Sequence, residues 1–156
     1  MFHRLFLIQI LVVSTVTLQA AQDSSSDLRV LFLGGAPGSH QPAARARQLI
    51  PALNPRGIRV TYTEEVDWLR KERLAEFDCL LLYANIDTIT PSQEQALLEF
   101  VAGGKGFVPL HCASFCFRNS SAFVELVGAQ FKSHRTGVFS TRCTKPDHPI
   151  MATGPL

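Results

Sequence analysis

His111 and Cys112 are the neighbouring residues whose types best suit chemistry, because they end an apolar run that begins at Gly106. A strand that ends in a nucleophile and opens directly into a helix is the elbow geometry of several α/β enzymes. At a helix start, the dipole and a protonated histidine nearby would lower the pKa of the thiol. The glycines of G-x-S-x-G are missing, and a small buried thiol is the simpler interpretation of Cys112. These two residues therefore allow two alternatives: His111 acts as a proton carrier, or Cys112 acts as a nucleophile.

Other polar groups follow other apolar runs of the chain. Ligands of open α/β sheets bind outside the carboxyl ends of the strands. The segments expected at that edge are 34–41, 83–87 and 111–114. The first of them reads Gly-Gly-Ala-Pro-Gly-Ser-His, which does not match the G-x-G-x-x-G spacing of a dinucleotide site.

Two of the histidines, together with an aspartate, could also form a metal or acid–base cluster. The residues available for it besides His111 are His40, His134, His148, Asp87 and Asp147. Cys112 and Cys116 are four apart and would share a helix face, where they could bind a metal or react with each other under oxidation. A structural zinc site needs four ligands, so this pair is weak support, and we assign no metal ligand.

Strands and helices alternate along the chain, and these elements must position the polar groups. We expect strands over residues 29–34, 58–63, 78–84 and 106–111, and helices over 42–53, 90–102 and 121–127. Thr90, Pro91 and Gln93 form a helix start with a capping box, whereas Pro51 should kink or shorten the helix that contains it. We expect one short helix over residues 66–74, and weak alternation predicts a fifth strand over 137–144.

This order of elements predicts an α/β fold, a parallel sheet with right-handed crossovers and helices on both faces. The length of 156 residues and the 46% hydrophobic content suit one domain with a real core. A charged content of 18% and a net charge of +2 exclude a disordered chain and argue against a nucleic-acid partner. Four cysteines are too few for a disulfide scaffold.

The first residues have the order of a secretory signal. A basic start with Arg4 precedes an apolar run over residues 5–18, and the small residues Ala20 and Ala21 follow. The run is short for a membrane span, which needs roughly 20 residues. We expect a cleaved signal peptide over 1–21, a polar linker over 22–27, and a periplasmic or secreted protein with no membrane span after cleavage. The alternative is an uncleaved membrane anchor.

Six segments together resemble the ThuA-like (trehalose-utilisation) family, and the resemblance runs from about residue 28 to the end. They read LFLGGAPGSHQPAARARQLIPAL, RGIRVTYTEE, DCLLLYANID, PSQEQALLEFVAGGKGFVPLHCAS, LVGAQFKSHRTGVF and DHPIM. The resemblance implies a flavodoxin-like fold of the class I glutamine amidotransferase-like group and a role in sugar metabolism, particularly of keto-disaccharides. We expect a ThuA-like domain over residues 28–156 that is incomplete at its C-terminus.

The resemblance also bears on single residues. Cys112 takes the elbow position when residues 107–114 are laid on the amidotransferase motif, but that cysteine is not general in the family. Near the first loop, Ser39 replaces one of two histidines that are common in the family, and His40 keeps the other. Exported relatives are often fused to haem-binding or sugar-processing domains.

The first functional hypothesis is an exported domain that binds or processes a small-molecule carbohydrate. His40, His111 and His134 would be catalytic, with one of them as proton carrier. The substrate-binding residues would be Tyr83, Asn85, Asp87 and Ser114. The alternatives are a non-catalytic carbohydrate-binding or interaction module of a larger protein, and a hydrolase or amidotransferase-like enzyme built on Cys112. The sequence leaves open whether the chain is an enzyme, which cofactor it uses and whether it forms a homo-oligomer.

Overall fold

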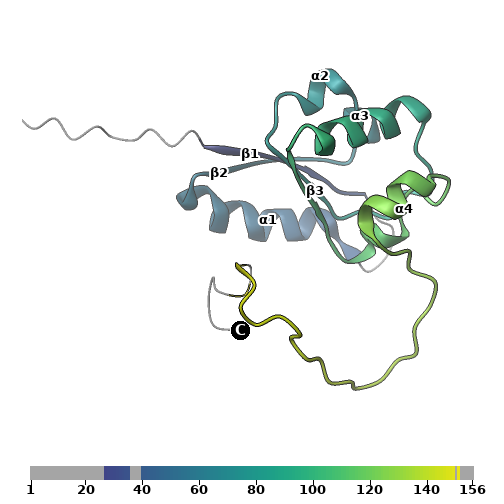
Figure 1. Cartoon of the computed structure of the whole chain (residues 1–156). Helices are drawn as coiled ribbons and strands as arrows, with labels where there is room; N and C mark the ends of the chain where they lie inside the picture. Colours follow the sequence, from purple (N-terminus) through teal and green to yellow (C-terminus); the bar gives the residue numbers. More distant parts are fainter. Residues whose placement is uncertain (1–26, 36–39, 150, 152–156) are drawn as a thin grey trace, which may run out of the picture.

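The structure is a computed structural model that describes residues 27–35, 40–149 and 151. The expected signal peptide and the first five residues of the expected linker lie outside the described residues. Four strands form the centre of the fold (Figure 1): β1 (Leu28–Leu33), β2 (Ile58–Thr63), β3 (Cys79–Leu82) and β4 (Gly106–Pro109). The helices around them are α1 (Pro42–Leu53), α2 (Lys71–Leu74), α3 (Pro91–Ala102) and α4 (Ser121–Val127). In the described part of the chain, no helix is long and apolar enough to cross a bilayer.

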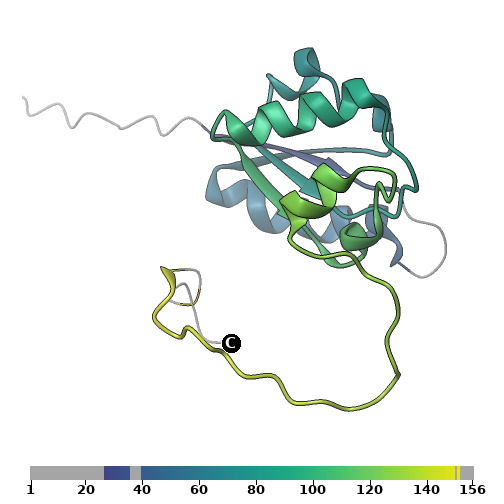
Figure 2. The ribbon, with the colours of Figure 1, turned by 45° about the vertical axis from the view of Figure 1, so that its right-hand side comes forward.

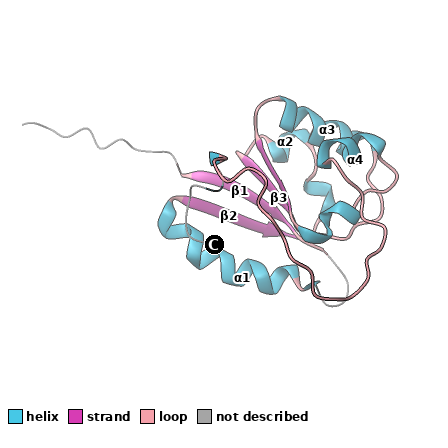
Figure 3. Ribbon diagram, turned by 60° about the horizontal axis from the view of Figure 1, so that its bottom comes forward, coloured by secondary structure: helices cyan, strands magenta, loops and turns pink. Residues whose placement is uncertain are grey.

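All strand pairs are parallel, and the strand order is β2-β1-β3-β4. This is the order of the first four strands in the flavodoxin-like arrangement, in which the sheet grows in both directions from β1. The parallel strands and the helices that connect them confirm the expected α/β fold (Figure 3).

Alternate residues of the central strands supply two separate cores. Leu31, Leu33, Leu80 and Leu82 are fully buried beneath α2, α3 and α4, together with Phe123. On the other face, Phe32 and Tyr83 pack with Ala46 of α1. The helices accordingly lie on both faces of the sheet (Figure 2), as the continuous apolar runs predict.

Helix α3 begins as expected from the sequence. The Thr90 hydroxyl accepts a hydrogen bond from the Gln93 backbone, and the Gln93 side chain accepts one from the Thr90 backbone, which completes the capping box. Helix α1 does not end early at Pro51 but continues to Leu53 and into a short 3-10 helix, η2 (Asn54–Arg56). Pro51 is tolerated because it lies near the end of the helix, where its missing N–H removes only one of the last helical hydrogen bonds.

Two expected elements differ in the structure. Residues 66–74 form the 3-10 helix η3 (Val66–Trp68) and then α2, because Leu69 leaves the helical conformation and is fully buried in the core. No strand forms over residues 137–144, where Val138 and Phe139 are 106% and 82% exposed. Two adjacent side chains that both face solvent have no covering layer, and the weak alternation alone does not stabilise a strand. This segment runs outside the sheet in a wide arc (Figure 1).

Asp78 should make the protein sensitive to acid. Its carboxylate accepts hydrogen bonds from the Arg29 guanidinium at 3.1 Å and from Lys105 Nζ at 2.9 Å, at the amino ends of three strands. These bonds hold the pKa of Asp78 well below its ordinary 3.8. The stability gained is therefore present above pH 3.8 and is lost as the pH falls toward the lowered folded pKa. Urea unfolding across that range should show a smaller acid-induced loss in Asp78→Asn than in the wild type. The exposed control Asp147→Asn should follow the wild type, and equal losses in all three proteins would contradict the prediction.

Candidate functional site

The carboxyl ends of β1, β3 and β4 bring three polar residues to one edge of the sheet. His40 precedes α1 in the segment after β1, Asn85 follows β3, and His111 follows β4. All three line a cavity of about 440 Å³. Its other lining residues are Cys112, Ser114, Phe115, Phe131 and His134. Six of the eight residues expected at a site from the sequence thus lie around one cavity, at the edge where parallel α/β sheets bind ligands.

His111 occupies the strained position of the turn that follows β4. Its φ is 52°, whereas Cys112 is not among the described non-glycine residues with positive φ. A side chain in this left-handed region costs conformational energy and persists where the surrounding structure enforces it. The sequence placed Cys112 at the elbow position, whereas the positive φ of this turn is at His111, the residue before it.

The two histidines His40 and His111 are adjacent. Their ring centroids are 5.0 Å apart in an edge-to-face arrangement. The Ser114 hydroxyl donates to the His111 carbonyl at 3.2 Å and thereby holds the turn from within. Two neighbouring imidazoles at a strand end can exchange protons with a ligand that lies between them and Asn85.

The Oδ1 atom of Asn85 is buried and has no hydrogen-bond partner. Its backbone is fixed, since its N–H donates to the Gly35 carbonyl at 2.8 Å. A buried polar atom without a partner costs free energy, and such an atom in a cavity is suited to accept a hydrogen bond from a ligand.

Cys116 is a structural residue of the loop that carries Asn85. Its thiol donates to the Ala84 carbonyl at 3.0 Å and accepts from the Ile86 N–H at 3.4 Å. Burial raises the pKa of Cys116 to about 11. None of the four cysteines is in a disulfide. The thiol therefore holds the loop in place and is not free to join Cys112 at a metal.

Aromatic rings form one wall of the cavity, which the sequence did not predict. Phe131 lies edge-on to Phe115 at 5.9 Å and to the His134 ring at 5.6 Å. The Phe131 N–H also donates to the Ser114 carbonyl at 3.0 Å. Phe131 thereby places His134 beside the cavity from a segment without regular structure, and this contact leaves no periodic signal in the sequence.

Two of the expected substrate-binding residues do not line this cavity. Asp87 is exposed, and its carboxylate pairs with the Arg118 guanidinium. The Tyr83 hydroxyl donates to the His40 backbone carbonyl at 2.9 Å. The polar groups of both side chains already have protein partners.

Comparison with known proteins identifies the family. The family model for ThuA, described as trehalose utilisation, matches residues 29–155. The chain belongs to the ThuA family. A solved structure of a ThuA-like protein from Bacteroides uniformis matches with a TM-score of 0.57 and 16% identity, over 70% of this chain and 47% of that one. The chain thus spans about half the length of that protein, and at this identity the likeness shows the fold. No curated protein matches the sequence.

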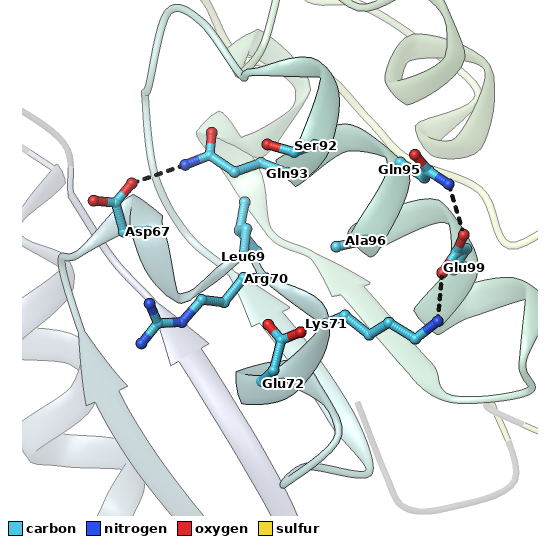
Figure 4. A pocket seen from close by; sticks show the side chains of 10 residues that line it. All are labelled: Asp67, Leu69, Arg70, Lys71, Glu72, Ser92, Gln93, Gln95, Ala96 and Glu99. Carbon is cyan, nitrogen blue, oxygen red and sulfur yellow. Dashed lines mark hydrogen bonds and ion pairs between the residues drawn. The ribbon is translucent and has the colours of Figure 1, made fainter.

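A second hollow of the ThuA chain lies between α2 and α3 and has a volume of about 480 Å³. Its side chains include both charge signs, and several of them pair with each other (Figure 4). Gln93 donates to Asp67, while Glu99 accepts from Gln95 and pairs with Lys71. These side chains already bond to one another. The cavity lined by His40, His111 and His134, called the histidine cavity below, is therefore the better candidate site. Among the described residues, no three His, Cys, Asp or Glu side chains are grouped to hold a metal ion.

Cys112 should react slowly with alkylating agents at neutral pH. Burial raises its pKa above the ordinary 9.0, and the 3-10 helix that contains it, η4 (His111–Phe115), is too short to lower that pKa as the sequence suggested. Iodoacetamide labelling of Cys112, followed by mass spectrometry in a Cys143→Ser background, should accelerate only as the pH rises past 9.0. The exposed Cys143 of the wild type serves as the fast reference. Rapid labelling of Cys112 at about pH 6 would contradict the prediction and indicate an activated thiol.

Proposed function

We propose that the histidine cavity of this ThuA-family chain binds a sugar derivative, such as a keto-disaccharide, and that His111 or His40 transfers a proton to or from it. The observation that carries the proposal is the partnerless Oδ1 of Asn85 in a cavity lined by three histidines. A sugar hydroxyl can donate to that oxygen, while the Phe115 and Phe131 rings can pack against the apolar C–H face of a sugar. The family, described as trehalose utilisation, supports a carbohydrate ligand.

Calorimetric titration with trehalose and with its keto derivative tests the proposal. We expect the keto derivative to bind, and Asn85→Leu to weaken that binding about fivefold, because one hydrogen bond contributes about 1 kcal/mol. Asn85→Asp keeps an acceptor oxygen and should retain more affinity than Asn85→Leu. Absence of binding by the wild type, or equal affinity in the leucine variant, would overturn the proposal.

Turnover separates an enzyme from a binding module. Mass spectrometry of the bound sugar after incubation should detect a changed product if the histidines act as acid and base. Binding without any product would favour the non-catalytic module. The hydrolase built on Cys112 is disfavoured, because burial raises the pKa of its thiol, and the positive φ of the turn is at His111 and not at Cys112.

We also propose that the chain is exported. The support is the sequence alone: Arg4, the apolar run over residues 5–18 and the small residues Ala20 and Ala21. Mass spectrometry of the exported protein should find a new N-terminus near Ala20 or Ala21. An intact Met1 would contradict cleavage and favour the membrane anchor.

A further inference from the structure

Tyr83 connects the core of the sheet to the candidate site. It directly follows β3, is only 8% exposed and packs in one cluster with Phe32, Ala46 and Cys112. Its ring is therefore fixed by the sheet and by α1. A side chain held in this way can fix the position of any group that bonds to it.

The polar end of Tyr83 is bonded to the backbone of His40. The hydroxyl donates to the His40 carbonyl at 2.9 Å, a contact between residues 43 apart in the sequence. The Tyr83 ring centroid also lies 6.3 Å from the His40 ring and 5.9 Å from the His111 ring. Tyr83 thus contacts both histidines of the adjacent pair.

His40 needs such support because the helix start beside it lacks the usual cap. The Ncap residue of α1 is Gln41, which has φ of 50° and makes no side-chain capping bond. In contrast, Thr90 and Ser120 cap α3 and α4 with their hydroxyls. The left-handed conformation of Gln41 is strained, and without a capping bond it persists only where neighbouring contacts enforce it, such as the Tyr83 bond to the adjacent His40 carbonyl.

We propose that Tyr83 is a positioning residue that holds His40 against His111 through the hydrogen bond to the His40 carbonyl. The importance of this role rests on the proposed function, because Tyr83 would position the two histidines that exchange protons with the sugar. It replaces the expectation that Tyr83 binds substrate directly, because its hydroxyl is already bonded to the backbone.

The test compares Tyr83→Phe with the matched control Tyr62→Phe. Tyr62 packs against the same cluster, its ring lies edge-on to Phe32 at 5.2 Å, and its hydroxyl bonds to Glu64 instead of a histidine. Each variant loses one hydroxyl and keeps its ring. Amide spectra recorded by nuclear magnetic resonance establish that both variants remain folded.

The first readout needs no ligand. Nuclear Overhauser contacts between the His40 and His111 rings should weaken several-fold in Tyr83→Phe and stay unchanged in Tyr62→Phe. The contact between His134 and Phe131 is the internal reference and should not change in either variant. Unchanged contacts between His40 and His111 in a folded Tyr83→Phe protein would overturn the proposal.

The second readout is the affinity for the keto derivative of trehalose. Tyr83→Phe should weaken it about fivefold, as expected for one lost hydrogen bond, and Tyr62→Phe should leave it unchanged. If the wild type does not bind this sugar, the proposed function fails, and the ring contacts alone decide the role of Tyr83. Weakened ring contacts with unchanged affinity would reject a role in sugar binding.

Discussion

Replacing His111 with alanine should lower the turnover of a keto-disaccharide by a factor on the order of 100 or more, the usual effect of losing one general acid–base group. The imidazole is placed at the strained turn after β4 and beside His40, within the candidate cavity. Steady-state kinetics of His111→Ala measure the effect.

Two variants serve as controls for this prediction. Cys112→Ser keeps the side-chain volume nearly unchanged and should retain most of the activity, since its thiol is buried and protonated. His148→Ala removes a histidine that does not line the cavity and should behave like the wild type. Loss of activity in Cys112→Ser but not in His111→Ala would reverse the assignment and favour the cysteine hydrolase.

Replacing Phe117 with alanine should destabilise the fold by about 3–5 kcal/mol, as is usual for a buried phenylalanine. Phe117 is fully buried, lies edge-on to Phe123 at 4.9 Å, and donates its N–H to the Ile86 carbonyl at 2.7 Å. Its φ of 48° is an additional conformational cost that the packing of the ring offsets. Since whole domains are stable by about 5–15 kcal/mol, the variant should unfold at much lower urea concentration.

Phe139→Ala is the matched control for this second prediction. It makes the same chemical change at a side chain that is 82% exposed, and should leave the urea midpoint nearly unchanged. Similar midpoints for the two variants would show that the contacts of Phe117 contribute little to stability.

The sequence predicted the elements whose signals are local. Continuous apolar runs located β1, β3 and β4, alternation located β2, and the capping box of Thr90 and Gln93 located the start of α3. The helix over residues 121–127 also has the predicted bounds. The fifth strand was wrong because alternation describes a strand only where a neighbouring strand and a covering layer exist. Whether a neighbouring strand and a covering layer exist depends on the tertiary structure, and it cannot be predicted from the sequence of residues 137–144.

The candidate site was predicted in outline by one topological rule. Parallel strands deliver the residues after them to one edge, which is why His40, Asn85 and His111 meet although they are far apart in the sequence. The rule does not say which residue takes the strained position of a turn, which is His111 in the structure. It also cannot identify hydrogen-bond partners, and Tyr83 and Asp87 proved to be bonded to protein groups.

The strand order also bears on the sequence of events during folding. The Arg59–Asp27 pair joins β2 to the start of β1 across 32 residues, and the Arg29–Asp78 pair joins β1 to the start of β3 across 49. Loop-closure entropy differs by only ~0.4 kcal/mol between these lengths, so chain distance does not decide which pairing forms first. The β1–α1–β2 unit contains the helix that covers one face of its strands and most of the hydrophobic cluster around Phe32. In contrast, β3 is covered only when α2 and α3 pack against it. We therefore expect the transition state for folding to contain the β1–α1–β2 unit, with the histidine cavity assembled after it. Substitutions in that unit should slow folding, and those around Asp78 should mainly accelerate unfolding.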